Sequence, residues 1–179
     1  MKNPWQRLSR KVDYQSQYIT VIKDKVIQPD GSPSHYYFIE KDQFVMVVAF
    51  DHGMVYLVRQ WRYPVNQESW EAPAGYIEAK EKPLPAAKRE LAEETGLRAK
   101  SWTRLGFAYT SSGMTNQGFH IFLAQQLSVG KNNLEAGESD IIVKKISLAS
   151  VVKMINQGKI KDGTTIVAIY FLKQYLKNL

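Results

Sequence analysis

The chain has 179 residues, 44% of them hydrophobic, which is enough for one compact domain with room for a small appendage. It contains no cysteine, so disulfides and thiolate metal sites are excluded, and a bound metal would be a hard cation held by oxygen or imidazole ligands. Its 24 lysine and arginine residues against 17 acidic residues give a net charge of +7, which favours an anionic partner, but they are scattered and do not specifically indicate nucleic acid.

The N-terminal part has the pattern of a small antiparallel sheet. Two β-like stretches, residues 14–27 and 34–40, flank a turn sequence at residues 29–31, so we expect a hairpin or small sheet here. Residues 44–50 and 54–62 are two apolar strands joined by a short turn. They predict a second hairpin that enters the core.

A helix is predicted from Pro83 to Thr95. Prolines at positions 83 and 85 are tolerated only in a first helical turn, strong helix formers follow them, and Gly96 supplies a C-terminal cap. Further along, the patterns predict strands at residues 102–110, 118–127 and 141–148, a loop at 128–139, and helices at 149–158 and 164–176. Strands outnumber helices without regular alternation, which favours an α+β sandwich with helices flanking a mixed sheet.

The most informative segment covers residues 75–97. In its helix Glu90, Glu93 and Glu94 stand at i, i+3 and i+4, so they project from one face. Carboxylates this close repel one another unless a cation lies between them. Oxygen ligands suit Mg²⁺ or Mn²⁺, and Mg²⁺ commonly binds one or two carboxylates together with substrate phosphate oxygens. The segment therefore predicts a metal site that receives a diphosphate, and the alternative is a solvated acidic face.

Residues next to this cluster support the same interpretation. Arg89 and Glu81 carry opposite charges, and we expect their attraction to hold the preceding loop to the helix. Gly75 and Gly96 are expected to supply backbone freedom at a tight loop entry and at the helix C-terminus. Ala74 precedes the loop, and its carbonyl oxygen is available to a metal.

The segment resembles the Nudix box. That motif is a glycine, five residues, a glutamate, seven residues, and then Arg-Glu-aliphatic-any-Glu-Glu-any-Gly-aliphatic. The chain matches all nine fixed positions, which are Gly75, Glu81, Arg89, Glu90, Leu91, Glu93, Glu94, Gly96 and Leu97. The resemblance implies a Nudix-type α/β/α sandwich over residues 42–179, preceded by an N-terminal antiparallel sheet over residues 1–41. It also implies that Glu90, Glu94 and the Ala74 carbonyl bind Mg²⁺ or Mn²⁺, with Glu93 as a further ligand or proton acceptor.

Residues 58–78 resemble the stretch before the box in ADP-ribose pyrophosphatases and nucleoside diphosphate sugar hydrolases. They contain Arg59 and Arg62 in an Arg-Gln-aromatic-Arg motif, and Glu71 in a Glu-any-Pro-Ala-Gly motif, and all three are candidate substrate-binding residues. Guanidinium groups pair with phosphate oxygens and keep their charge, so Arg62 is expected to bind the diphosphate. The alternative is that these arginines form surface salt bridges.

Relatives of this kind usually form homodimers that exchange the N-terminal sheet, whose aromatic residues help to bind the base. The resemblance therefore implies a homodimer, with Trp5 and Tyr14 as candidate base contacts. A tryptophan near a terminus also commonly packs on its own domain, which is the alternative for Trp5.

The segment of residues 109–124 aligns with a loop that commonly holds two prolines and an acidic pair in ADP-ribose pyrophosphatases. Thr110 and Ser112 replace the prolines, and Asn116 and Gln117 replace the acidic pair, which removes charge and a backbone constraint. We therefore expect a broader set of nucleotide sugars than ADP-ribose alone.

Three more residues complete the predicted site. Gly113 and Met114, in the same loop, are candidate substrate contacts. Glu138 lies where related enzymes keep a mobile glutamate that activates water, so Glu138, or else Glu93, is expected to act as the general base. The alternative for Glu138 is an ordinary solvated loop residue.

The sequence thus predicts Mg²⁺-dependent hydrolysis of nucleoside diphosphate sugars to a nucleoside monophosphate and a sugar 1-phosphate. The alternatives are a dedicated ADP-ribose pyrophosphatase, a non-catalytic Nudix domain that senses a ligand, and RNA-end binding, which only the net charge suggests. No apolar run approaches the ~18 residues of a membrane span, so we expect a cytoplasmic protein with neither a membrane nor a nucleic-acid partner. His35, His52 and His120 have no partner at metal-binding spacing, and structural roles are expected for them.

Overall fold

The computed structural model describes residues 2–130 and 141–179. The described chain forms two compact units. The N-terminal unit contains the residues up to Asp42 together with Tyr109–Gly118, and the main unit contains Gln43–Ala108 and the described residues from Phe119 to Leu179.

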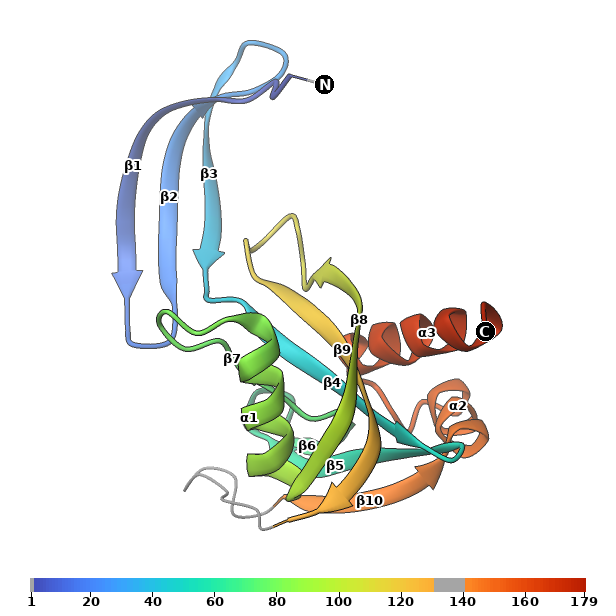
Figure 1. The fold of residues 1–179 in the computed structure, drawn as a ribbon. Helices are drawn as coiled ribbons and strands as arrows, with labels where there is room; N and C mark the ends of the chain where they lie inside the picture. Colours follow the sequence, from blue (N-terminus) through green and yellow to red (C-terminus); the bar gives the residue numbers. More distant parts are fainter. Residues whose placement is uncertain (1, 131–140) are drawn as a thin grey trace. The chain divides into compact units, whose positions relative to one another are not determined.

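The N-terminal unit is built on a three-stranded antiparallel sheet (Figure 1). Its strands are β1 (Gln6–Gln15), β2 (Thr20–Ile27) and β3 (Pro33–Glu40), in that order across the sheet. The predicted turn between β2 and β3 is confirmed, with Gly31 at a φ of 87°. The interpretation of residues 14–27 as one β-like stretch was wrong, because a turn closed by Ser16 separates two strands there. The hydroxyl oxygen of Ser16 accepts the N–H groups of Tyr18 and Ile19, both at 3.2 Å.

An ion-pair network spans this sheet. Arg10 donates through Nε and Nη2 to the two carboxylate oxygens of Asp24, both at 2.9 Å, and through Nη1 to Glu40 at 2.9 Å. Its guanidinium also lies over the ring of Phe38, 5.2 Å from the centroid. The hydrogen bonds and charge of Arg10 lower the pKa of the buried Asp24, so the carboxylate is held in its ionised form.

The main unit is built on a mixed sheet. Its central strands follow the order β10 (Ile142–Ser147), β5 (Met54–Arg62), β4 (Phe44–Asp51), β9 (Gly118–Val129) and β8 (Leu97–Tyr109). Strands β4 and β9 are parallel, whereas β4 and β5 form the predicted hairpin, with His52 and Gly53 at positive φ in its turn. Strand β8 begins at Leu97, five residues before the predicted start at Trp102.

Two short strands were not predicted from the sequence. Strand β6 (Gln67–Glu71) pairs with β5, and β7 (Ala74–Tyr76) pairs with β4, after a single 3₁₀ turn at Tyr63–Val65. They bring the segment that precedes the box against the centre of the sheet.

Helices cover both faces of this sheet, as expected for an α/β/α sandwich. Figure 1 shows α1 (Pro83–Thr95) on one face and α2 (Leu148–Asn156) and α3 (Gly163–Lys177) on the other. The buried side chains of β4 alternate between the two layers. Val45, Val47 and Ala49 pack with Ala86, Ala87 and Leu91 of α1, and Met46, Val48 and Phe50 pack with Val151, Ile169 and Leu172 of α2 and α3. The predicted fold class and the predicted extent of α1 are confirmed.

No helix in the described ranges is long and apolar enough to cross a membrane.

Candidate active site

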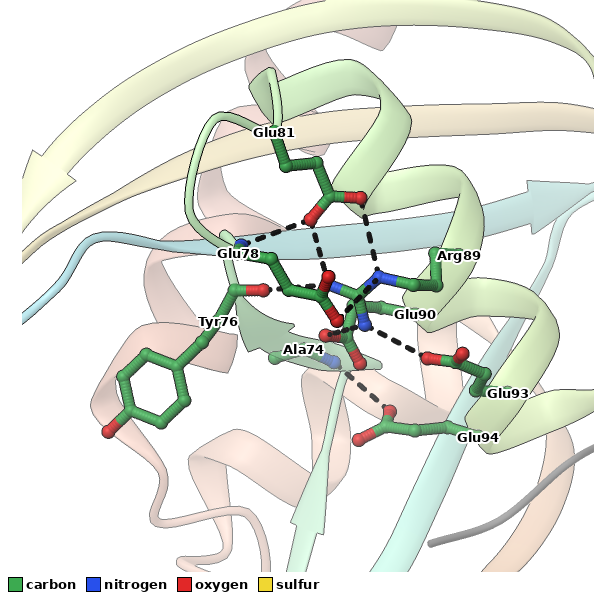
Figure 2. Close-up of polar contacts among 8 residues, drawn as sticks. All are labelled: Ala74, Tyr76, Glu78, Glu81, Arg89, Glu90, Glu93 and Glu94. Atoms are coloured by element: carbon green, nitrogen blue, oxygen red, sulfur yellow. Dashed lines mark hydrogen bonds and ion pairs between the residues drawn. The ribbon is translucent and has the colours of Figure 1, made fainter. Parts of the chain in front are cut away.

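Arg89 lies at the centre of the carboxylate cluster on α1 (Figure 2). Its Nη1 donates to Glu90 at 2.7 Å and to Glu93 at 2.9 Å. Its Nη2 donates to Glu81 at 3.0 Å and to the carbonyl oxygen of Tyr76 at 2.8 Å. The hydrogen bond with Glu81, followed by the charge of Glu90 and the hydrogen bonds with Glu90 and Glu93, raises the pKa of Arg89, so the guanidinium is permanently charged.

Arg89 binds more carboxylates than the sequence predicts. The expected pairing of Arg89 with Glu81 is present, and the same guanidinium also forms ion pairs with Glu90 and Glu93, for which the sequence predicts a metal ion. Within residues 2–130 and 141–179, no three acidic or histidine side chains form a closed metal-binding group. The cation that lies between two of the box carboxylates here is therefore an arginine of the box itself.

Glu90 lies directly against the backbone of Gly75. Glu90 is buried, with 7% of its surface exposed, and a Cβ atom placed on Gly75 would collide with its carboxylate. Gly75 lies in β7 and does not have a positive φ, so the expectation that it supplies backbone freedom is wrong. The glycine is required because a charged group approaches its Cα. Gly96, in contrast, caps α1 with a φ of 68° as expected.

Glu94 binds the segment that contains Ala74. It is 2% exposed, and its carboxylate accepts the N–H of Ala74 at 3.0 Å. The carbonyl of Pro73 accepts the N–H of Val47 in β4 at 2.8 Å, and the N–H of Ile77 donates to Gln43, the residue before β4, at 3.1 Å. In antiparallel pairing, alternate residues bond to the neighbouring strand. The N–H and C=O of Ala74 therefore point to the other edge of β7, where Glu94 and Arg89 lie. This orientation suits the metal-binding role expected for the Ala74 carbonyl.

Arg62 and Glu71 form a two-bond ion pair. Nε of Arg62 donates to one carboxylate oxygen at 2.9 Å and Nη2 to the other at 2.5 Å, while Glu71 is only 6% exposed. The hydrogen bond to Glu71 raises the pKa of Arg62, and the charges of Glu94 and Asp162 add to this effect. Arg62 is thus close enough to Glu94 of the box for the two charges to interact.

Arg59 pairs with a more exposed carboxylate than Arg62 does. Its Nη1 lies 3.2 Å from Glu68, whose side chain is largely exposed, and its guanidinium lies over the ring of Trp70, 5.6 Å from the centroid. This geometry matches a surface salt bridge, the alternative role for Arg59.

Two residues of the site had no motif to mark them. Asp162 caps α3, and Thr165 accepts the N–H of Ala72 at 2.9 Å with its side-chain oxygen. The sequence Asp162-Gly163-Thr164-Thr165 is a recognisable start for a helix. The contact with Ala72 joins residues 93 positions apart, so no local pattern indicates it.

The remaining described candidates belong to the N-terminal unit. The ring of Trp5 packs edge-on against Tyr36 with centroids 5.4 Å apart, and Tyr14 is exposed. The carbonyl of Gly113 accepts the hydroxyl of Tyr36 at 3.0 Å, and Met114 is exposed. Trp5 therefore packs within its own unit, which is the alternative role for this residue.

The loop that contains Gly113 is held by the amides that replace the acidic pair. The side-chain oxygen of Asn116 accepts the N–H of Lys41 at 3.0 Å, and Nε2 of Gln117 donates to the carbonyl of Asp42 at 2.9 Å. A carboxylate at position 117 has no hydrogen to donate at neutral pH. These bonds supply a constraint where the two prolines are absent.

Glu138 lies outside the described residues. Of the histidines, His52 occupies the β4–β5 turn and His35 lies near the start of β3. His120 bonds through Nε2 to Gln43 at 3.0 Å, and burial, with a contribution from Arg104, lowers its pKa. The sequence predicts a core or interface hydrogen bond for His120, and the bond that it makes is exposed.

Two family models match this chain. The one described as "NUDIX domain" matches residues 41–163, and the one described as "Nucleoside diphosphate sugar hydrolase N-terminal domain" matches residues 5–39. The chain belongs to the Nudix family. Enzymes of this family generally use divalent metal ions, and the relatives of this Nudix protein indicate a pyrophosphohydrolase.

Similar proteins cover nearly the whole Nudix chain. An ADP-ribose pyrophosphatase of Bacillus subtilis (strain 168) is 32% identical over 168 residues, which cover 93% of this chain and 91% of the relative. A GDP-mannose pyrophosphatase of Escherichia coli O9:H4 (strain HS) is 28% identical over 185 residues, which cover 88% of this chain and 96% of the relative. The crystal structure of an ADP compounds hydrolase matches with a TM-score of 0.88 at 19% identity, covering 97% of this chain and 95% of that one. This last similarity establishes the fold.

Proposed function

We propose that this Nudix hydrolase cleaves the diphosphate of a broad set of nucleoside diphosphate sugars, using Mg²⁺, for which Mn²⁺ can substitute. The products are a nucleoside monophosphate and a sugar 1-phosphate. The observation that carries the proposal is the burial of Glu90 and Glu94, at 7% and 2% exposed, against the backbone of β7. Burying a carboxylate costs free energy even where an arginine compensates its charge, as Arg89 does for Glu90, so two buried carboxylates beside one stretch of backbone favour a chemical role.

The residues around Gly75 fit a divalent cation. Glu90, Glu94 and the carbonyl of Ala74 would hold it, with Glu93 as a further ligand, and all four supply the oxygen atoms that Mg²⁺ prefers. Gly75 leaves room for the Glu90 carboxylate where any side chain would displace it. When bound, the cation supplies charge neutralisation at the diphosphate and a more acidic bound water. Arg89 orients Glu90 and Glu93 on the helix face.

Arg62 is the proposed diphosphate ligand of the protein. Glu71 binds Nε and Nη2 of Arg62, which aligns the guanidinium and leaves the hydrogens of Nη1 to bind phosphate oxygens. The charge on Arg62 is secure because Glu71 raises its pKa. Arg59, on the same strand, is a second candidate, although its exposed pairing with Glu68 supports this role less directly than the buried partner of Arg62 does.

A carboxylate accepts the proton of the attacking water. Glu93 is suitably placed on the helix face, and Glu138 is the other proposed base. As the water oxygen forms its bond to one phosphorus, the bridging P–O bond breaks on the opposite side, and Arg62 stabilises the charge that collects on the leaving phosphate.

The N-terminal unit is proposed to mediate a homodimer by exchange of its sheet and to contact the base through Trp5 or Tyr14. Every residue of β1 is exposed, including the apolar Leu8 and Val12, both at 48%. Apolar side chains on an open strand favour burial against another surface. We propose that a second copy of this chain supplies that surface. Sedimentation equilibrium should show a dimer that Leu8→Glu dissociates, and a concentration-independent monomer would contradict both dimerisation and sheet exchange.

The substrate range is tested by rates with ADP-ribose, GDP-mannose, UDP-glucose and ADP-glucose at equal Mg²⁺. The proposal predicts comparable kcat/KM across the set. The second candidate is a dedicated ADP-ribose pyrophosphatase, which the 32% identity to the Bacillus subtilis enzyme favours. A strong preference for ADP-ribose alone would establish that candidate and overturn the broad range.

A further inference from the structure

The segment that contains Ala74 is held by a helix on the far face of the sheet. Ala72 donates its N–H to the hydroxyl oxygen of Thr165 in α3 at 2.9 Å, and both residues are fully buried. The next two residues are held as well, since the carbonyl of Pro73 accepts from Val47 at 2.8 Å and Ala74 donates to Glu94 at 3.0 Å. The backbone from Ala72 to Ala74 is therefore held by one hydrogen bond per residue, from α3, β4 and α1 in turn.

The hydroxyl of Thr165 is itself firmly placed. Asp162 caps α3, and its carboxylate accepts the N–H of Thr165 and the hydroxyl of Thr164, both at 2.7 Å. This fixes the first turn of the helix, and a β-branched side chain has few rotamers once its backbone is fixed. The Thr165 oxygen thus gives the buried N–H of Ala72 a rigid acceptor. Valine at this position has the same shape and leaves that N–H without an acceptor.

We propose that Thr165 is a positioning residue for the metal-binding backbone. Its bond to Ala72 sets the place of the segment whose Ala74 carbonyl would hold the cation. The residue before Ala72 is Glu71, so the same bond also sets the position from which Glu71 aligns Arg62. The inference rests on the proposed function, because it requires the Ala74 carbonyl to bind a metal.

The test is Mn²⁺ binding by the full-length protein without substrate, measured by electron paramagnetic resonance or calorimetry. Removing an outer partner of a metal ligand commonly weakens binding 10- to 100-fold, so Thr165→Val should raise the Mn²⁺ dissociation constant on the order of tenfold. Thr165→Ser, which keeps the hydroxyl, should restore binding close to the wild-type value. Thr164→Val is the matched control. It removes a hydroxyl from the same helical turn, but this hydroxyl bonds to Asp162 and not to Ala72.

The outcomes separate this inference from the proposed function. If Thr165→Val melts at a lower temperature but binds Mn²⁺ as Thr164→Val does, the role of Thr165 is only structural and the inference is overturned. If the wild-type protein binds no Mn²⁺, the proposed function fails and the positioning role fails with it.

A measurement on the wild-type protein covers the case in which Thr165→Val does not fold. The amide of Ala72 should exchange slowly with solvent, and the amide chemical shifts of Ala72 and Ala74 should both move when Mg²⁺ is added. Rapid exchange at Ala72, or shifts that Mg²⁺ leaves unchanged, would overturn the inference.

Discussion

Replacing Gly75 with alanine should disable the site by displacing a single carboxylate. The new Cβ would lie 2.1 to 2.3 Å from the carboxylate atoms of Glu90, which would have to retreat by roughly 1.5 Å to reach ordinary van der Waals separation. A misplacement of about 1 Å at a reacting group is enough to lower a rate about 10²-fold. The shift also disturbs the 2.7 Å contact between Glu90 and Arg89. The added methyl group overpacks the site, and the free energy of unfolding should fall by about 1 to 3 kcal/mol.

The assay compares turnover of ADP-ribose at saturating Mg²⁺ with thermal unfolding followed by circular dichroism. Gly163→Ala is the matched control, since a Cβ there meets no atom within 4 Å and the residue begins α3 without a positive φ. It should retain full turnover and stability. The reasoning is refuted if Gly75→Ala turns over substrate as fast as Gly163→Ala does.

Arg62→Lys should raise the KM for ADP-ribose about tenfold, because an ammonium group cannot pair with Glu71 through two bonds and also bind phosphate, while Arg59→Lys should change it less. Equal effects in the two variants would contradict the role of Arg62. Arg10 lowers the pKa of Asp24 in the folded state. The stability that this ion pair contributes is therefore fully present above the unfolded-state pKa of Asp24, and it is lost as the pH falls through the lower folded-state pKa. Wild-type stability to urea should therefore fall more steeply below about pH 4 than that of Asp24→Asn, and parallel curves would contradict this.

Elements with strong local signals could be predicted from the sequence. The β4–β5 hairpin follows from two apolar runs around a turn with His52 and Gly53 at positive φ, and α1 follows from its prolines and from Gly96. In both cases the residues that define the boundary lie next to it in sequence.

The missed elements depend on weaker or more distant contacts. The turn between β1 and β2 contains no glycine or proline and is closed by the hydroxyl of Ser16, which is a weak sequence signal. Strands β6 and β7 are short and lack a clear alternation, and they are defined by pairing with β5 and β4. Their existence is a property of the sheet and not of their own residues.

The site divides in the same way. The spacing of Glu90, Glu93 and Glu94 along one helix is local, and it predicted their common face. Position 75 is a glycine because the carboxylate of Glu90, fifteen positions away in the chain, lies against it. The role of Thr165 likewise depends on its bond to Ala72. Contacts between separate elements of this kind become visible only when the elements are assembled.

Turnover by Glu90→Gln and Glu94→Gln tests the central claim most directly. Glutamine keeps the shape of each side chain, and the amide oxygen at position 94 can still accept the N–H of Ala74, so both variants should fold normally. With Mg²⁺ and ADP-ribose or GDP-mannose, both should lose turnover, whereas Glu68→Gln, a change at an exposed pair with Arg59, should retain it. Near-normal rates in both box variants would contradict the account.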